Sequence, residues 1–215
     1  DLAAAGLHCT IEYLGPDVTD ERSALDSVEA YLDLLESLQA ADLLDRSELS
    51  IKASDMGLDL PGGAEIALAN TKRIAQAAAE LGTLLTLDME AYPTVDPTFD
   101  LFHAVQSQFP RTGIVVQAYL RRTEVDCQQL ARSDARVRLV KGAFEESAEV
   151  AFQTSQDIDL SFVRSMKSLM SGKGVPLIAT HDPRLIEIAA ALAVRTNRER
   201  SSYEFQMLLG VRPEG

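Results

Sequence analysis

The stretch that decides the fold is Arg-Val-Arg-Leu-Val-Lys-Gly-Ala-Phe, residues 136–144. Its apolar, β-branched content over a short run predicts a strand. Arg138 is unusual there, because a charge inside a strand is costly unless it meets an opposite charge or a polar ligand. The strand ends in Lys141, Gly142 and Ala143, a cation that favours an anionic partner and two small residues that let a ligand approach the backbone. Two interpretations stay open, a ligand site or an arginine paired with a neighbouring acid.

The composition is that of an acidic globular chain. It has 215 residues, of which 46% are hydrophobic and 25% charged, with a net charge of −13. This charge argues against a nucleic-acid partner, which would require a basic face. No apolar run is long enough to span a bilayer. The two cysteines, Cys9 and Cys127, fit no metal-binding or secreted disulfide pattern, so free thiols in a reducing compartment are expected.

Strand and helix patterns alternate along the whole chain. Seven strands are expected at 7–14, 49–53, 84–87, 113–119, 136–144, 176–180 and 203–207. Helices are expected over 21–42 and about 124–132, and around 66–81, 99–109, 162–170 and 185–192. The alternation predicts an α/β fold with parallel strands, and the size of the repeat suits a (β/α)8 TIM-type barrel whose last strand and helix are missing. No Gly-rich dinucleotide motif or phosphate-binding loop follows any strand.

Polar residues follow nearly every predicted strand, which is where a barrel carries its function. Solvated strand ends would also be polar, so this pattern alone does not establish a site. Asp88 and Glu90 have three open interpretations: an acid/base pair, partners for Lys52 and Arg138, or loop acids. His181 lies where a helix begins and suits an anion or a ring edge, or has no role. Three scattered histidines predict no catalytic metal, and no nucleophilic triad is evident.

Four segments together resemble one known family, the proline dehydrogenases. Residues 138–144, Arg-Leu-Val-Lys-Gly-Ala-Phe, resemble its Arg-Leu-Val-Lys-Gly-Ala-Tyr motif, and residues 178–182, Ile-Ala-Thr-His-Asp, its Ala-Thr-His-Asn segment. Residues 203–208, Tyr-Glu-Phe-Gln-Met-Leu, resemble Glu-Phe-Gln-x-Leu, and residues 87–90 the Asp-x-Glu strand end. Order and separations agree over most of the chain, which is similar to the single-function bacterial enzymes and to the proline dehydrogenase domain of proline utilisation A.

The resemblance implies one catalytic domain over residues 1–215, a distorted (β/α)8 barrel that holds FAD. It implies that L-proline gives a hydride from C5 to flavin N5 and forms Δ1-pyrroline-5-carboxylate. Electrons would then pass to a membrane quinone, as the first step of proline catabolism. The implied location is cytoplasmic, with peripheral contact at the inner face of the membrane left open.

The resemblance also assigns roles residue by residue. The catalytic residues would be Lys52, Asp88 and Arg138, with Lys52, Ala143 and Leu208 on the substrate. The cofactor would be held by Asp88, Val116, Gln117, Arg138, Val140, Lys141, Gly142, Ala143, Thr180, His181, Asp182, Gln206 and Met207. Cations for an anionic flavin and a carboxylate, and small residues for close approach, agree with these roles.

The sequence departs from the family pattern in four places. Phe144 replaces a Tyr, Asp182 replaces an Asn, and Leu209 stands where Tyr or His is common. The family's last strand and helix, which carry a Tyr and an Arg-Arg-x-x-Glu run that grips the proline carboxylate, are not found, so the full gene product is expected to continue past Gly215. Two alternatives stay open: another barrel enzyme with a Schiff-base lysine at Lys52 or Lys141, and a non-catalytic truncated relative.

Overall fold

The computed structural model describes residues 2–211, and the chain divides into two compact units between Ile114 and Val115. Each unit consists of parallel strands joined by helices, and the strands follow one another in the order of the chain. This confirms the expected α/β class and the repeating unit of a (β/α)8 barrel. In this described part, no helix is both long and apolar enough to cross a membrane.

The first unit contains three strand–helix repeats and the start of a fourth strand. β1 pairs with β2, β2 with β3, and β3 with the first two residues of β4, all in parallel. The elements are β1 (Cys9–Glu12), α1 (Glu21–Ala40), β2 (Ser47–Ile51), α2 (Gly63–Glu80), β3 (Leu84–Leu87), α3 (Val95–Gln106) and β4 (Gly113–Gln117). Short 3-10 turns lie at Ala3–Ala5, Leu44–Arg46 and Tyr92–Thr94.

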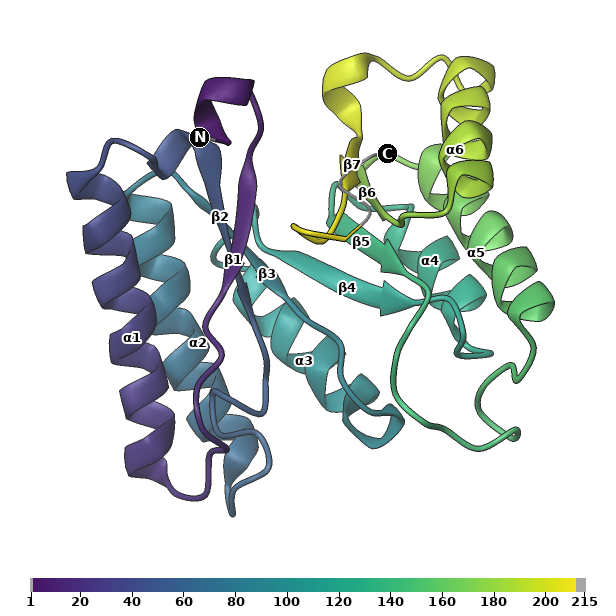
Figure 1. Cartoon of the computed structure of the whole chain (residues 1–215). Helices are drawn as coiled ribbons and strands as arrows, with labels where there is room; N and C mark the ends of the chain where they lie inside the picture. Colours follow the sequence, from purple (N-terminus) through teal and green to yellow (C-terminus); the bar gives the residue numbers. More distant parts are fainter. Residues whose placement is uncertain (1, 212–215) are drawn as a thin grey trace. The chain divides into compact units, whose positions relative to one another are not determined.

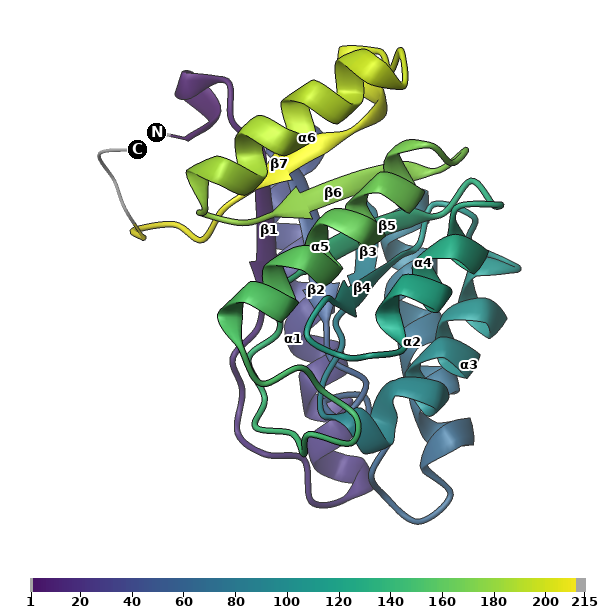
Figure 2. The same ribbon diagram turned by 90° about the vertical axis from the view of Figure 1, so that its right-hand side faces the viewer.

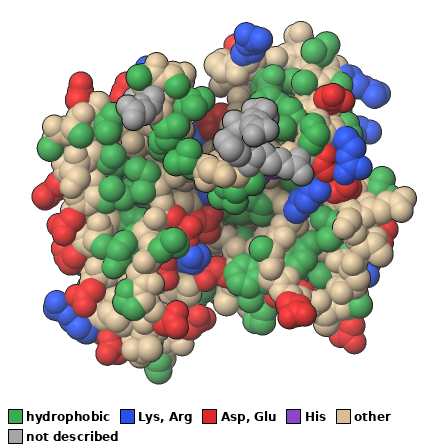
Figure 3. All heavy atoms as spheres, in the orientation of Figure 1, with side chains coloured by type: hydrophobic (Ala, Val, Ile, Leu, Met, Phe, Trp, Pro, Cys, Tyr) green, Lys and Arg blue, Asp and Glu red, His purple; other side chains and the backbone are tan. Residues whose placement is uncertain are grey.

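Helix α1 shows how this unit builds its core. Asp20 caps the helix by accepting a hydrogen bond from the Ser23 amide, and the buried face includes Val28, Tyr31 and Leu35. The Tyr31 hydroxyl donates to the Ser50 carbonyl at 2.7 Å, which ties the helix to the end of β2. Figure 1 shows α1 and α2 side by side, and acidic side chains lie along the outer side of α1 in Figure 3.

The second unit begins within β4 and ends in the shortest strand. β5 pairs with β6, and β6 with β7, again in parallel. The amides of Ala118 and Tyr119, just after β4, donate to the carbonyls of Val140 and Lys141 at 2.8 Å. The elements are α4 (Thr123–Leu130), β5 (Arg136–Val140), α5 (Ser155–Met170), β6 (Val175–Ala179), α6 (Pro183–Arg195), a 3-10 turn at Arg200–Ser202, and β7 (Glu204–Gln206). Figure 2 shows α5 between α4 and α6.

The two faces of β5 differ in kind. Val137 and Leu139 are buried, and Val137 lies with Leu130 of α4 and Leu169 of α5 around a small void. Alternation along the strand places Arg136 and Arg138 on the opposite face, where both are partly exposed. The strand therefore presents apolar side chains to the helices and cations to the other side.

Several local predictions are confirmed. The strand at 84–87 has the expected bounds. Gly82 is expected to end a helix and follows α2 with a left-handed φ of +79°. Asp182 and Pro183 are expected to cap and start a helix, and they do so at α6. Both cysteines are free, and Cys127 is buried. The strands predicted at 7–14, 113–119, 136–144 and 203–207 are shorter than expected, whereas those predicted at 49–53 and 176–180 keep their length and begin earlier, at Ser47 and Val175.

Two local predictions are wrong. The helical spacing of Leu25, Val28, Leu32 and Leu35 predicts one apolar face. Leu25 is nevertheless 38% exposed, because anchoring of the Tyr31 hydroxyl turns the neighbouring face of α1, with Ala24 and Val28, into the core. The pair Asp96-Pro97 predicts a helix N-cap followed by a first-turn proline. Asp96 does not cap α3, however, which begins at Val95 directly after the turn at Tyr92–Thr94. Pro93, at the start of that turn, begins the helical segment earlier than Pro97 would.

Arg198 fixes the approach to β7. Its Nε and both terminal nitrogens donate five hydrogen bonds, all to backbone carbonyls, at 2.7 to 3.0 Å. The acceptors are Leu169, Met170, Gly172, Gly174 and Ser202. They belong to the last turn of α5, the loop before β6 and the turn before β7, so one guanidinium ties three segments of backbone together.

Arg198→Lys should therefore destabilise the protein, because an ammonium cannot reach the five carbonyls that the forked guanidinium binds. We expect a loss of about 2 kcal/mol in the free energy of unfolding, measured by urea denaturation. Arg200→Lys, an exposed position in the adjoining turn, is the matched control and should change this free energy by less than about 0.5 kcal/mol. Equal midpoints for the two variants would show that the carbonyl contacts do not stabilise the fold.

Candidate functional site

In the second unit, β5 and β7 are joined by polar side chains across β6. Arg138 Nε donates to Gln206 Oε1 at 2.7 Å, and Arg136 Nη1 lies 3.1 Å from Glu204 Oε1. Arg138 is in register with Leu177, which is in register with Glu204, so the Arg138–Gln206 bond leans toward the C-terminal ends of the strands. This contact holds the cation at the end of the sheet where parallel strands carry ligands.

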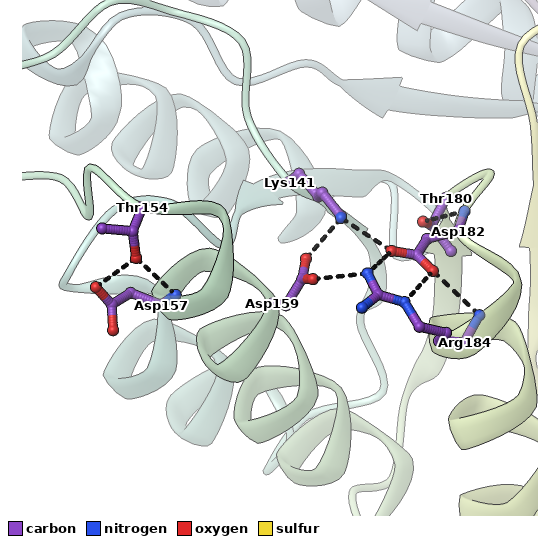
Figure 4. A network of polar contacts seen from close by, with 7 residues as sticks. All are labelled: Lys141, Thr154, Asp157, Asp159, Thr180, Asp182 and Arg184. Carbon is purple, nitrogen blue, oxygen red and sulfur yellow. Dashed lines mark hydrogen bonds and ion pairs between the residues drawn. The ribbon is translucent and has the colours of Figure 1, made fainter.

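Four charged side chains form a closed ring at the ends of β5 and β6, drawn in Figure 4. Lys141 Nζ contacts Asp159 Oδ1 at 2.6 Å and Asp182 Oδ2 at 3.3 Å. Arg184 Nη2 contacts the other oxygen of Asp159 at 3.0 Å and Asp182 Oδ2 at 2.7 Å. We call Lys141, Asp159, Asp182 and Arg184 the charge ring. Its two cations and two carboxylates alternate around the ring, so that the ring has no net charge.

Asp182 is the most strongly held member of the charge ring. Its carboxylate accepts the Arg184 side chain, the Arg184 backbone amide and Lys141, and its own amide donates to Thr180 Oγ1. The Arg184 hydrogen bonds, more than those of Lys141, hold the pKa of Asp182 well below its usual range. The Asp182 side chain therefore stays ionised at neutral pH while it caps α6.

Gly142 lies against the side chain of Tyr119, which leaves no room for a Cβ. Gly142 has φ +107°, and a Cβ added there would lie 2.1 Å from Tyr119 Cδ1. The Tyr119 side chain is buried, and its hydroxyl has no hydrogen-bond partner in the described part of the chain. Burial, with a smaller effect of Glu146, raises the pKa of Tyr119 to about 12. The hydroxyl thus remains a protonated donor at neutral pH.

The end of β6 contacts the segment after β7. His181 Nε2 accepts a hydrogen bond from the Leu208 amide at 3.0 Å, which assigns the imidazole proton to Nδ1 in the neutral ring. Met207 and Leu208 are exposed, at 56% and 72%. His181 thus fixes the backbone of a segment whose side chains remain accessible.

In the first unit, Lys52 follows β2 and forms an ion pair with Glu12 at the end of β1. Burial lowers the pKa of Lys52, but the hydrogen bond from Lys52 to Glu12 and nearby carboxylates outweigh it, so the pKa is raised. A Schiff-base lysine needs a lowered pKa to act as a nucleophile. The ion pair with Glu12, which keeps Lys52 charged, therefore disfavours the alternative in which Lys52 attacks a carbonyl.

Asp88 and Glu90 accept hydrogen bonds from serines that flank Lys52 in sequence. Ser50 Oγ donates to Asp88 Oδ2 at 2.6 Å, and Ser54 donates to Glu90 through its amide at 3.0 Å and its hydroxyl at 2.5 Å. The Asp88 amide donates to the Ile51 carbonyl at 2.8 Å. These bonds fix both acids against the end of β2.

The remaining predicted residues differ in exposure. Thr180 is buried, as are Val116 and Gln117 on β4, whereas Val140 and Gln206 are partly exposed. Ala143 is exposed beside Gly142. In the described residues, no three His, Cys, Asp or Glu side chains gather as a metal site would require.

Sequence reasoning missed two members of the charge ring, Asp159 and Arg184. Both lie near the starts of helices that follow strands, α5 and α6. A usable signal was present for Arg184, which is two residues after a capping aspartate where the family pattern has Asn. Asp159 had no such signal, since its partner Lys141 is 18 residues away.

The sequence comparisons match this chain to proline dehydrogenases. The sequence profile described as proline dehydrogenase matches residues 1–213. Proline dehydrogenase 1 of Bacillus subtilis (strain 168) is 34% identical over 213 residues, which cover 99% of this chain and 69% of that protein. Proline dehydrogenase of Deinococcus radiodurans is 30% identical over 210 residues, 96% of this chain and 67% of that protein.

Solved structures agree with this likeness. Proline utilization A from Bdellovibrio bacteriovorus, inactivated by N-propargylglycine, has a TM-score of 0.85 and 25% identity, over 96% of this chain and 26% of that one. Proline utilization A from Corynebacterium freiburgense has a TM-score of 0.82 and 23% identity, over 98% and 25%, and supports the fold alone. The chain spans about a quarter of the length of these structures.

Gly142→Ala should be strongly destabilising, because the new Cβ meets the Tyr119 ring and the backbone has a left-handed φ. We expect a loss of about 3 kcal/mol in the free energy of unfolding, measured by urea denaturation. Gly82→Ala is the matched control, since its φ is +79° and nothing lies within 4 Å of an added Cβ. It should cost about 1 kcal/mol. Equal losses at the two glycines would mean that the Tyr119 contact is unimportant.

Proposed function

Because the chain belongs to the proline dehydrogenase family, we propose that it oxidises L-proline to Δ1-pyrroline-5-carboxylate as an FAD-dependent enzyme of proline catabolism. FAD, when bound, would supply the chemistry by accepting a hydride and passing electrons to a quinone. Transfer to a membrane quinone would require peripheral contact with the bilayer.

The observation that carries the proposal is the arrangement at the end of β5. Arg138 lies on the polar face of the strand and is held there by Gln206. Two residues beyond the strand, Gly142 is partly exposed, has φ +107° and lies against the ring of Tyr119, whose hydroxyl has no hydrogen-bond partner in the described part of the chain. A cation, an exposed backbone and a buried donor fit a large, planar and electron-rich cofactor.

Most of the proposed cofactor-binding residues lie in the second unit. We assign Arg138 to the flavin ring, where a guanidinium favours negative charge. Lys141 would face the anionic part of the cofactor, since its side chain is 38% exposed and an ammonium has three donors. Thr180, His181, Gln206 and Met207 would complete the contacts from β6 and β7. Val116, Gln117, Val140, Gly142 and Ala143 are assigned to the cofactor with them, and Asp182 is assigned to it indirectly, through the lysine that it holds.

Residues of the first unit are assigned to the substrate. Lys52 is a protonated ammonium at neutral pH, and it would hold the carboxylate of proline. Asp88, which Ser50 holds, is assigned to catalysis and to the cofactor. Ala143 and Leu208, which are exposed in the second unit, would supply apolar contact to the pyrrolidine ring.

An absorption spectrum with and without proline tests the proposal. The purified chain, reconstituted with FAD, should show a flavin band near ~450 nm that bleaches on addition of proline. Lys52→Met should leave flavin affinity unchanged but raise the proline concentration for half-bleaching roughly ten- to hundredfold, the loss of a charge-assisted hydrogen bond.

Lys72→Met, on α2 of the same unit, is the control and should behave as the unsubstituted chain. A chain that binds no flavin after reconstitution would contradict the proposal. A mass adduct on Lys52 after borohydride treatment with substrate would instead favour a Schiff-base enzyme.

A further inference from the structure

The charge ring contains an apparent contradiction. Asp182 brings a carboxylate to within 3.3 Å of Lys141, the cation proposed above to face an anionic cofactor. The family pattern has a neutral Asn at this position, so this chain places an extra negative charge beside its binding cation. Asp159 is a second carboxylate on the same ammonium, at 2.6 Å. Without Arg184, Lys141 and these two acids together would carry a net charge of −1.

Arg184 resolves the contradiction. Its guanidinium contacts Asp182 through two nitrogens, Nε at 3.1 Å and Nη2 at 2.7 Å, and reaches Asp159 at 3.0 Å. With Arg184 in place the ring is neutral, and each carboxylate is shared between two cations. The Asp182 side chain is only 14% exposed, whereas Arg184 is 72% exposed, so the arginine covers the acid from the solvent side.

The geometry points to Arg184 as a positioning residue for Lys141. Arg184 neutralises Asp182 and holds both carboxylates in place, while Lys141 keeps one of its three donors for an anionic ligand. Two of the three Lys141 protons are directed at Asp159 and Asp182. The third is available at an accessible side chain. This inference rests on the proposed function, because it takes the anionic ligand to be FAD.

The arrangement predicts that the effects of positions 182 and 184 depend on each other. Arg184→Gln leaves two acids around one lysine, which repels a pyrophosphate and draws Lys141 toward the carboxylates. Asp182→Asn in the same chain removes the uncompensated charge and restores neutrality. A merely structural role for Arg184 would give no such rescue, since removing a second ring member would weaken the structure further.

The experiment measures the dissociation constant of FAD for the apoprotein by quenching of flavin fluorescence. Arg184→Gln should raise this constant roughly three- to tenfold, and the deficit should shrink in 0.5 M salt. Arg184→Lys keeps the charge and should stay within about twofold. The double variant Asp182→Asn/Arg184→Gln should also return to within about twofold.

Arg195→Gln is the matched control, because it removes the same charge from the other end of α6 and should have little effect. The circular dichroism spectrum of each variant apoprotein should superpose on that of the unsubstituted chain. Unchanged affinity in Arg184→Gln, or a deficit that Asp182→Asn does not rescue, would overturn the inference alone. Absence of FAD binding by the unsubstituted chain would overturn the proposed function and this inference with it.

Discussion

Strand β5 carries two arginines on one face, and its other face is buried. Val137 and Leu139 pack toward the helices, so Arg136 and Arg138 are directed to the opposite side. A charge there is tolerated only with partners, which β7 supplies as Glu204 and Gln206. Arg198 fixes the turn that leads into β7, and the position of Arg138 therefore depends on backbone contacts far from it in sequence.

The other polar groups are held near the first turns of the helices that follow strands. Asp182 caps α6 and also binds Lys141, and Asp159 near the start of α5 holds the same lysine. One side chain thus serves both the helix and the candidate site. In the first unit, hydroxyls do the comparable work, since Ser50 and Ser54 hold the two acids after β3. Rigid element ends, rather than long loops, position these groups.

Sequence patterns predicted the strands and their order, because apolar runs bounded by turn residues depend on local chemistry. They also placed Arg138 and Lys141 at a strand end. They failed where tertiary contacts decide: Leu25 faces solvent because the Tyr31 hydroxyl fixes the rotation of α1. Asp159 was missed for the same reason, since its pairing with Lys141, 18 residues away, and with Arg184 on another helix leaves no periodic signal.

We propose that segment 138–143 forms the cofactor-binding end of the second unit. A crystal structure of the chain with FAD bound tests it most directly. We predict that the guanidinium of Arg138 and the ammonium of Lys141 contact the bound FAD, with Gly142 packed against it and Tyr119 beneath. FAD bound without contact to residues 138–143 would contradict this account.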